Sequence, residues 1–259
     1  MTDFRAKYGP WAVVAGASEG LGAAFAESLA RRKLNLVLIA RREALLNSLA
    51  EKLSTAEGVE TRIAAFNLGN ANAIDMFVTG LDVEVGLLVY NAAFAPVGSW
   101  VSMSTSDLQR VVDINVTAPL LLARHLAPAM VTRGRGGIVL MSSLAGVQGS
   151  PRIATYAASK AFNSILAEGL WSELRDEGID VIASRAGAIR TPGYVAMGTA
   201  EAPGTLDAEI VAEQTLNALG KGPFVVPGLL NRVAHFAMSR LLPRKTAIGI
   251  MSRNTQDLS

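Results

Sequence analysis

Tyr156 and Lys160 are two ionisable residues four positions apart, in the segment Tyr-Ala-Ala-Ser-Lys. In a helix this spacing places both side chains on one face. A phenol with its ordinary pKa of about 10 is a poor base at neutral pH, and a lysine cation beside it stabilises the phenolate and lowers that pKa. The pair therefore predicts a proton donor and acceptor, although the same spacing also arises by chance in solvated surface pairs.

A second group of residues with chemical meaning is the glycine-rich segment Gly16-Ala-Ser-Glu-Gly20-Leu-Gly22. It lies between a short apolar run and an amphipathic run, so we expect a strand before it and a helix after it. Glycine at such a turn lets the backbone approach a pyrophosphate, and free N–H groups at the helix start face the anion. The spacing differs from the commoner G-x-G-x-x-G. We predict a nucleotide-binding turn.

The end of the second expected strand indicates which dinucleotide binds. A carboxylate there would bind the ribose 2′-hydroxyl of NAD, whereas an arginine suits the 2′-phosphate of NADP. Ala40, Arg41 and Arg42 supply no carboxylate, so we predict NADP (NADPH) in preference to NAD. In the alternative interpretation both arginines merely solvate the start of a helix, and Glu43 weakens the positive field.

The elements that must position these residues follow from the hydrophobic pattern. Strands are expected near residues 11–16, 34–40, 61–66, 85–91, 136–143, 179–187 and 223–227. Helical patterns separate them, including 23–32, 43–56, 107–131 and 155–176, and Pro119 and Pro128 should kink the third of these. Continuous apolar runs are typical of parallel strands covered on both faces. The expected fold is an α/β doubly wound parallel sheet of about seven strands, a single domain over 1–259.

The order of these features resembles the short-chain dehydrogenase/reductase family along nearly the whole chain. The resemblance is carried, in order, by Gly16/Gly20/Gly22, Tyr90-Asn91-Ala92-Ala93, Asn115, Ser142-Ser143, Tyr156/Lys160 and the segment 186–192. Ser143 lies thirteen residues before Tyr156, a spacing typical of the family. The resemblance implies that Ser143 stabilises the substrate oxyanion and that Tyr156 exchanges a proton with it. It also implies that Lys160 binds the nicotinamide ribose and tunes Tyr156, and that Asn115 holds a water in a proton relay.

The resemblance further implies a cofactor site built from the glycine turn, several strand ends and the late segment. Its members are Gly16, Ser18, Glu19, Gly20, Leu21, Gly22, Arg41, Arg42, Asn67, Leu68, Asn91, Ala92, Ala93, Tyr156, Lys160, Gly187, Ile189 and Thr191. Asn67 departs from the family pattern, which often has Asp at the adenine. Structural alternatives remain: Asn91 tying neighbouring strands together, Asn115 satisfying helix backbone near Pro119, and Thr191 capping the next turn.

Residues 191–206 are rich in Gly, Pro and Ala and predict a flap that closes over substrate. The expected pocket lining is apolar and consists of Tyr194, Val195, Met197, Phe94, Ala95, Val97 and Trp100. It favours an apolar ketone or secondary alcohol, with Arg152 and Arg190 as candidates for an acidic group or as surface residues. One alternative is a 3-oxoacyl-thioester reductase. Another is a non-catalytic dinucleotide-binding sensor or scaffold, which would not need Ser143, Tyr156 and Lys160.

Composition bounds the remaining function classes. The chain has no cysteine and only two histidines, His125 and His235, so we expect no metal site, and its net charge of +2 gives no reason to expect nucleic acid. Residues 221–259 hold six basic residues and one acid, +5, which leaves −3 for the remainder. The apolar spacing in 229–242 favours a helix packed on the sheet or roofing the pocket over membrane-surface contact. We expect a cytoplasmic location, and the resemblance implies a homodimer or homotetramer through the long helices.

Overall fold

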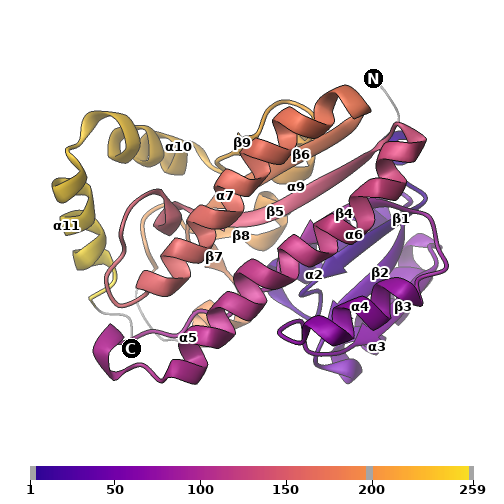
Figure 1. Cartoon of the computed structure of the whole chain (residues 1–259), viewed down its shortest axis with the longest axis horizontal. Helices are drawn as coiled ribbons and strands as arrows, with labels where there is room; N and C mark the ends of the chain where they lie inside the picture. The colour runs from indigo at the N-terminus through magenta and orange to yellow at the C-terminus, as the bar shows by residue number, and fades with distance from the viewer. Residues whose placement is uncertain (1–3, 197–200, 257–259) are drawn as a thin grey trace.

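The computed structural model describes residues 4–196 and 201–256, and its centre is a seven-stranded parallel sheet with helices on both faces (Figure 1). The strand order is β3-β2-β1-β4-β5-β6-β9. The strands are β1 (Trp11–Ala15), β2 (Asn35–Ala40), β3 (Thr61–Ala65), β4 (Val85–Tyr90), β5 (Gly136–Ser143), β6 (Ile179–Ala186) and β9 (Phe224–Val225). Because the order reverses between β1 and β4, a crevice forms at their carboxyl ends, where such sheets bind ligands. The predicted fold class is confirmed.

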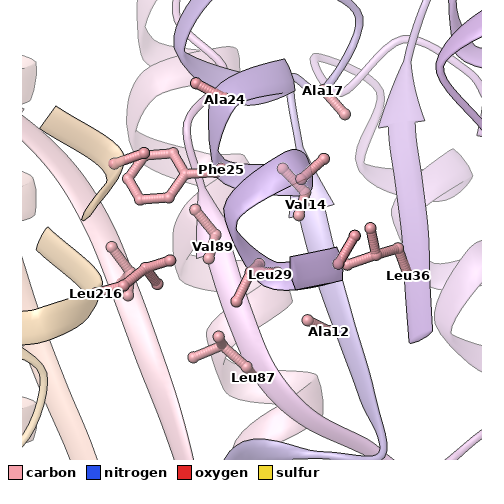
Figure 2. Packing of buried hydrophobic residues seen from close by; sticks show 14 of the residues in the cluster. Ala12, Val14, Ala17, Ala24, Phe25, Leu29, Leu36, Leu87, Val89 and Leu216 are labelled. Atoms are coloured by element: carbon pink, nitrogen blue, oxygen red, sulfur yellow. The ribbon is translucent and has the colours of Figure 1, made fainter. Parts of the chain in front are cut away.

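Both faces of the sheet are buried, which explains the continuous apolar strands. In β1 every residue is buried, and successive side chains belong to opposite cores: Ala12 and Val14 to one, Val13 and Ala15 to the other. Figure 2 shows the first core, in which Phe25 packs against strand residues. Full burial of a leucine or phenylalanine side chain contributes roughly 1.5–3 kcal/mol.

Helices cover the two faces in separate groups. The first core is closed by α2 (Gly20–Arg31), α3 (Glu43–Glu57) and α9 (Ala208–Ala218). The second is closed by α4 (Ala71–Thr79), α6 (Ala118–Arg133) and α7 (Ala154–Leu174). The short helix α1 (Phe4–Tyr8) precedes β1. Two further strands, β7 (Ile189–Arg190) and β8 (Leu206–Asp207), pair with each other outside the main sheet, and the short helix α8 (Pro192–Ala196) lies between them along the chain.

The long helix contains a π turn just before Pro119, the first of the two prolines at which a kink was expected. It runs from α5 (Thr105–Val112) through a π-helical turn at Asp113–Thr117 into α6, and Pro128 lies inside α6 without ending it. The N–H of Ala118 donates to the carbonyl of Asp113, five residues back, and Pro119 has no N–H. The carbonyl of Ile114 therefore lacks a main-chain donor, and the buried hydroxyl of Tyr90 donates to it.

The continuous helix Thr105–Arg133 is long and apolar enough to cross a membrane by length and composition alone. In the structure α6 packs against β4 and β5. We therefore interpret it as a core helix of the α/β fold.

The chain ends in α10 (Leu229–Phe236), a π turn at Ala237–Leu241 and α11 (Arg244–Asn254), which lie together at one end of the molecule beyond α7 (Figure 1). The expectation that the apolar side chains of 229–242 pack on the sheet or roof the pocket is wrong for five of them. They are between 56% and 75% exposed: Leu229, Leu230, Val233, Phe236 and Leu241. The helical spacing is present, but nothing in the described chain covers that face.

Candidate active site

A cavity of about 540 Å³ opens at the carboxyl ends of the central strands. Its volume lies within the range of roughly 300–1,000 Å³ that is usual for small-molecule sites. Of the residues expected to bind the cofactor, all except Gly22 line it, and Ser143 joins them. Asn115 does not line the cavity. The residues named from sequence thus come together at one place, the crevice where the strand order reverses.

Ser143, Tyr156 and Lys160 form one wall of this cavity. Ser143 ends β5 and Tyr156 lies in the first turn of α7, and their side chains are hydrogen-bonded to each other. The Ser143 hydroxyl also accepts a hydrogen bond from the N–H of Ala145 at 3.1 Å. Lys160 is buried one turn further on, with its Nζ 5.5 Å from the centre of the Tyr156 ring. A proton donor and a cation therefore face the same space.

Burial controls the ionisation of both groups. It raises the pKa of Tyr156, and the hydrogen bond with Ser143 offsets this only in part. It lowers the pKa of Lys160 to about 8. The net pKa of Tyr156 is therefore raised rather than lowered as expected, because burial outweighs the nearby Lys160, whose Nζ donates to the carbonyl of Met141 at 3.0 Å. At neutral pH Tyr156 is a neutral phenol and Lys160 is mostly cationic.

Asn115 lies in the π turn and is fully buried. Its Oδ1 accepts from the N–H of Phe94 at 2.8 Å, and its Nδ2 donates to the carbonyl of Phe94 at 2.9 Å and to Oγ of Ser159 at 3.0 Å. The Ser159 hydroxyl in turn donates to the carbonyl of Tyr156 at 2.6 Å. Asn115 therefore hydrogen-bonds backbone groups, as in the structural alternative. Those groups belong to the loop after β4 rather than to the helix near Pro119.

The glycine turn has the geometry of an anion cradle. Gly16 has φ +82°, and a Cβ there would lie 2.7 Å from the backbone N of Ala92. A Cβ on Gly22 would lie 1.9 Å from the carbonyl oxygen of Gly16, so no larger residue fits. Glu19, the N-cap of α2, makes no side-chain cap hydrogen bond, which leaves the first N–H groups of the helix available to an anion. These residues fit the pyrophosphate of a dinucleotide.

Asn91 has the structural role that we weighed for it. Its Nδ2 donates to the carbonyl of Gly16 at 3.1 Å and so ties the end of β4 to the turn after β1. Asn91 also lines the cavity, together with its neighbours Ala92 and Ala93.

The two arginines after β2 differ in their environment. Arg42 donates to the hydroxyl of Ser18 at 2.9 Å and forms an ion pair with Glu19 at 2.6 Å. Arg41 is exposed and makes no hydrogen bond or ion pair with any residue that the structure describes. Arg41 is therefore a free cation on the cavity wall, whereas the charge of Arg42 is shared with a carboxylate. Asn67 uses its Oδ1 to accept from the N–H of Gly69 at 3.1 Å.

In the segment after β6, the side chains of Arg190 and Thr191 contact other residues of the same segment. Thr191 accepts from the N–H of Tyr194 at 3.2 Å, which is the capping role weighed above. Arg190 forms ion pairs with Glu201, at 2.7 Å, and with Asp207. Its suggested role as receptor for an acidic substrate group is wrong, because two carboxylates already neutralise it. Of the expected flap 191–206, residues 197–200, including Met197, lie outside the described residues.

The substrate lining expected from sequence is partly in place. Phe94 and Tyr194 line the main cavity. Trp100 and Arg152 instead line a separate small cavity that also touches Tyr156. Sequence reasoning missed four residues of the main cavity: Phe66, Arg110, Ile114 and Met141. Adjacency to residues already named from the sequence could have indicated two of them, since Phe66 precedes Asn67 and Ile114 precedes Asn115. Nothing in the sequence marked Arg110.

The guanidinium of Arg110 lies 4.0 Å from the centre of the Phe94 ring. Such a cation–aromatic contact covers one face of the ring and fixes it at the cavity wall. His125 lies on the surface and contacts Asp75 at 2.9 Å, and His235 contacts the Phe224 ring. Across residues 4–196 and 201–256 there is no group of three potential metal ligands.

Comparisons with known proteins agree with this fold and identify its family. Residues 10–201 match the family model described as short chain dehydrogenase. The chain is 39% identical over 184 residues to the very-long-chain 3-oxoacyl-CoA reductase of Podospora anserina, a match that covers 68% of this chain and only 53% of that protein. A solved structure from work on 7beta-hydroxysteroid dehydrogenase stereoselectivity superposes with a TM-score of 0.90 and 26% identity, covering 96% of this chain and 98% of that one. A short-chain dehydrogenase from Sphingobium yanoikuyae in complex with NADPH has a TM-score of 0.78 and 30% identity, covering 90% and 96%.

Proposed function

This chain belongs to the short chain dehydrogenase family, and from that premise we propose that it is an NADP(H)-dependent oxidoreductase that interconverts an apolar ketone and a secondary alcohol. The observation that carries the proposal is the wall formed by Ser143, Tyr156 and Lys160. A complete set of these three side chains on one cavity argues against a non-catalytic sensor or scaffold.

The proposed chemistry divides between cofactor and chain. A nicotinamide dinucleotide bound in the cavity supplies or accepts the hydride. In ketone reduction Tyr156 donates its phenolic proton to the carbonyl oxygen, which suits a phenol whose pKa is raised by burial. The Ser143 hydroxyl donates a hydrogen bond to the same oxygen as negative charge develops. The buried ammonium of Lys160 stabilises the phenolate that remains.

The NADP(H) preference is supported by charge at the end of β2. Arg41 is free on the cavity wall and Arg42 stands beside it. A guanidinium binds a 2′-phosphate through paired N–H groups, and NADH has no such phosphate to offer. The structural relative in complex with NADPH is in keeping with this preference.

The proposed substrate is a bulky apolar ketone. Phe94, Ile114, Met141 and Tyr194 give the cavity apolar walls, and a relative named for 7beta-hydroxysteroid dehydrogenase stereoselectivity has nearly the same fold. A 3-oxoacyl thioester is the second candidate, since a very-long-chain 3-oxoacyl-CoA reductase is 39% identical over part of its length. The segment 191–206 is proposed to close over either substrate, since Thr191, Gly193 and Tyr194 line the cavity.

The proposal is tested by Tyr156→Phe, followed by the absorbance of NADPH with a panel of bulky ketones and 3-oxoacyl-CoA esters. We expect turnover to fall by roughly 10²–10⁴-fold, the usual contribution of a positioned acid, with NADPH affinity unchanged. Tyr8→Phe is the matched control, since it removes a phenol that does not line the cavity and whose hydroxyl donates to Asp180 at 2.6 Å. Unchanged turnover in Tyr156→Phe would remove the assignment. Whichever class of the panel turns over faster decides between the two substrates.

We also propose a homodimer through the long helices. Val112, Leu120 and Ile165 are exposed large apolar side chains on α5, α6 and α7. Burying them against a second copy would remove them from water. In light scattering, Ile165→Glu should halve the mass of the particle, whereas an unchanged mass would show that this face is not the subunit contact.

A further inference from the structure

An exposed apolar stripe runs along α10 and the π turn that follows it. It consists of Leu229, Leu230, Val233, Phe236 and Leu241, each more than half exposed. In a helix of 3.6 residues per turn, positions 229, 233 and 236 fall on one line and 230 lies to one side of it, while Leu241 follows in the π turn. The described chain therefore presents a continuous apolar face to the outside.

The opposite side of α10 is firmly held. Asn231 is buried, and its Nδ2 donates to the carbonyls of Gly204 and Pro227, both at 3.0 Å. Arg232 donates to the carbonyl of Val226 at 3.1 Å. These contacts fix the rotation of the helix, so the apolar stripe faces outward as part of the folded structure rather than as a helix detached from its packing site.

Basic side chains surround the stripe. Arg232, Arg240, Arg244, Lys245 and Arg253 are all exposed, and none forms an ion pair with a residue that the structure describes. Between residues 221 and 256 there is no Asp or Glu. The positive charge of this end is therefore not compensated locally, while the rest of the chain carries a net −3 (the total of +2 less the +5 of residues 221–259).

We infer that the apolar stripe and its basic border dock the protein on a bilayer that contains anionic lipids. An amphipathic helix at an interface buries its apolar face near the acyl chains while lysine and arginine meet anionic headgroups. This surface offers both chemistries together. A second copy of the chain would cover the apolar part, but a twofold contact would bring the two positive borders against each other.

The docked face lies close to the cavity. Asn231, on the inner side of α10, packs against Gly187, where a Cβ would lie 2.8 Å from Oδ1 of Asn231, and Gly187 lines the cavity. In the docked protein, α10 alone would separate the lipid from Gly187 in the cavity wall. The contact itself does not depend on the reaction proposed above.

The test is co-sedimentation of the full chain with vesicles of phosphatidylcholine alone or with added phosphatidylglycerol. We expect binding to the anionic vesicles only. The triple variant Leu229→Ser/Val233→Ser/Phe236→Ser and the charge variant Arg240→Glu/Lys245→Glu should each bind at least about 10-fold more weakly, since both the apolar area and each nearby basic residue contribute.

Controls separate docking from folding and from self-association. Met76→Ser and Lys52→Glu change an exposed apolar and an exposed basic residue elsewhere and should bind like wild type. Unchanged NADPH binding and circular dichroism show that each variant is folded. Absence of binding to anionic vesicles, or wild-type binding by the triple variant, overturns the inference. A lower particle mass for the triple variant, with no vesicle binding by wild type, would assign the stripe to a subunit contact instead.

Discussion

Glu19 places a negative charge beside the two arginines that we propose for the 2′-phosphate of NADP(H). Its carboxylate lies 2.6 Å from the guanidinium of Arg42, and the two side chains are 44% and 49% exposed. Glu19→Gln keeps an oxygen that accepts from Arg42 but removes the charge. We therefore expect this variant to bind NADPH more tightly and NADH unchanged.

The size of the effect follows from the distances. A phosphate on the free edge of Arg42 would lie about 5 Å from the Glu19 carboxylate, since the guanidinium binds one anion on each edge. Two unit charges at that distance in water repel by about 0.8 kcal/mol, and physiological salt reduces this to about half. Because a phosphate carries nearly two charges, removing the carboxylate should strengthen NADPH binding by about 1 kcal/mol, or about 5-fold.

The assay is a fluorescence titration of NADPH and of NADH with wild type, Glu19→Gln and Arg41→Ala. Arg41→Ala should weaken NADPH about 10-fold, in line with a lost charge-assisted contact, and leave NADH unchanged. Glu51→Gln is the control, since Glu51 is exposed on α3 and forms no ion pair within the described residues. The reasoning is refuted if Glu19→Gln leaves NADPH affinity unchanged, or if both cofactors tighten equally.

Three further predictions concern stability and cofactor binding. Lys160 has a pKa of about 8 when folded and an ordinary value of 10.5. Between pH 8 and 10 the unfolded chain therefore binds more protons than the folded one, and the unfolding free energy should rise by up to about 2 kcal/mol. Urea unfolding should show this rise in wild type and not in Lys160→Met. Gly22→Ala would place a Cβ 1.9 Å from a carbonyl oxygen of the turn, so titration should show NADPH affinity lowered at least about 10-fold. Tyr90→Phe leaves the buried Ile114 carbonyl without its donor and should lower the unfolding free energy by about 1–3 kcal/mol, and an unchanged melting temperature would contradict that account.

The sheet was predictable because burial on both faces leaves a direct mark on the sequence. The run 136–143 was expected as a strand and β5 has those bounds. The exception is the edge strand, where 223–227 was expected and only Phe224–Val225 pairs, since Pro223 and Pro227 cannot donate to a neighbour. Helix α2 begins at Gly20 rather than residue 23, because the glycine turn itself forms the first helical turn.

The residues of the candidate site were predictable as a set, but their mutual contacts were not. Spacing cannot show that Arg42 shares its charge with Glu19, or that Arg190 is neutralised by Glu201 and Asp207, because these partners meet only through the fold. Nor can spacing show how far burial outweighs Lys160 in setting the pKa of Tyr156. Periodicity in α10 indicates one apolar face, but what covers that face depends on the rest of the structure.

The π turn at Asp113–Thr117 amounts to a single inserted residue in a helix that is otherwise regular. Loss of one residue there would restore the ordinary i→i−4 pattern without changing the phase of the helix on either side. Leu122 and Leu126 would stay buried against the sheet. The positions that would change are those of Asn115 and of the Ile114 carbonyl. Insertion or deletion of one residue at this turn can therefore change the contacts that the helix makes beside the candidate site, while its packing against the sheet stays the same.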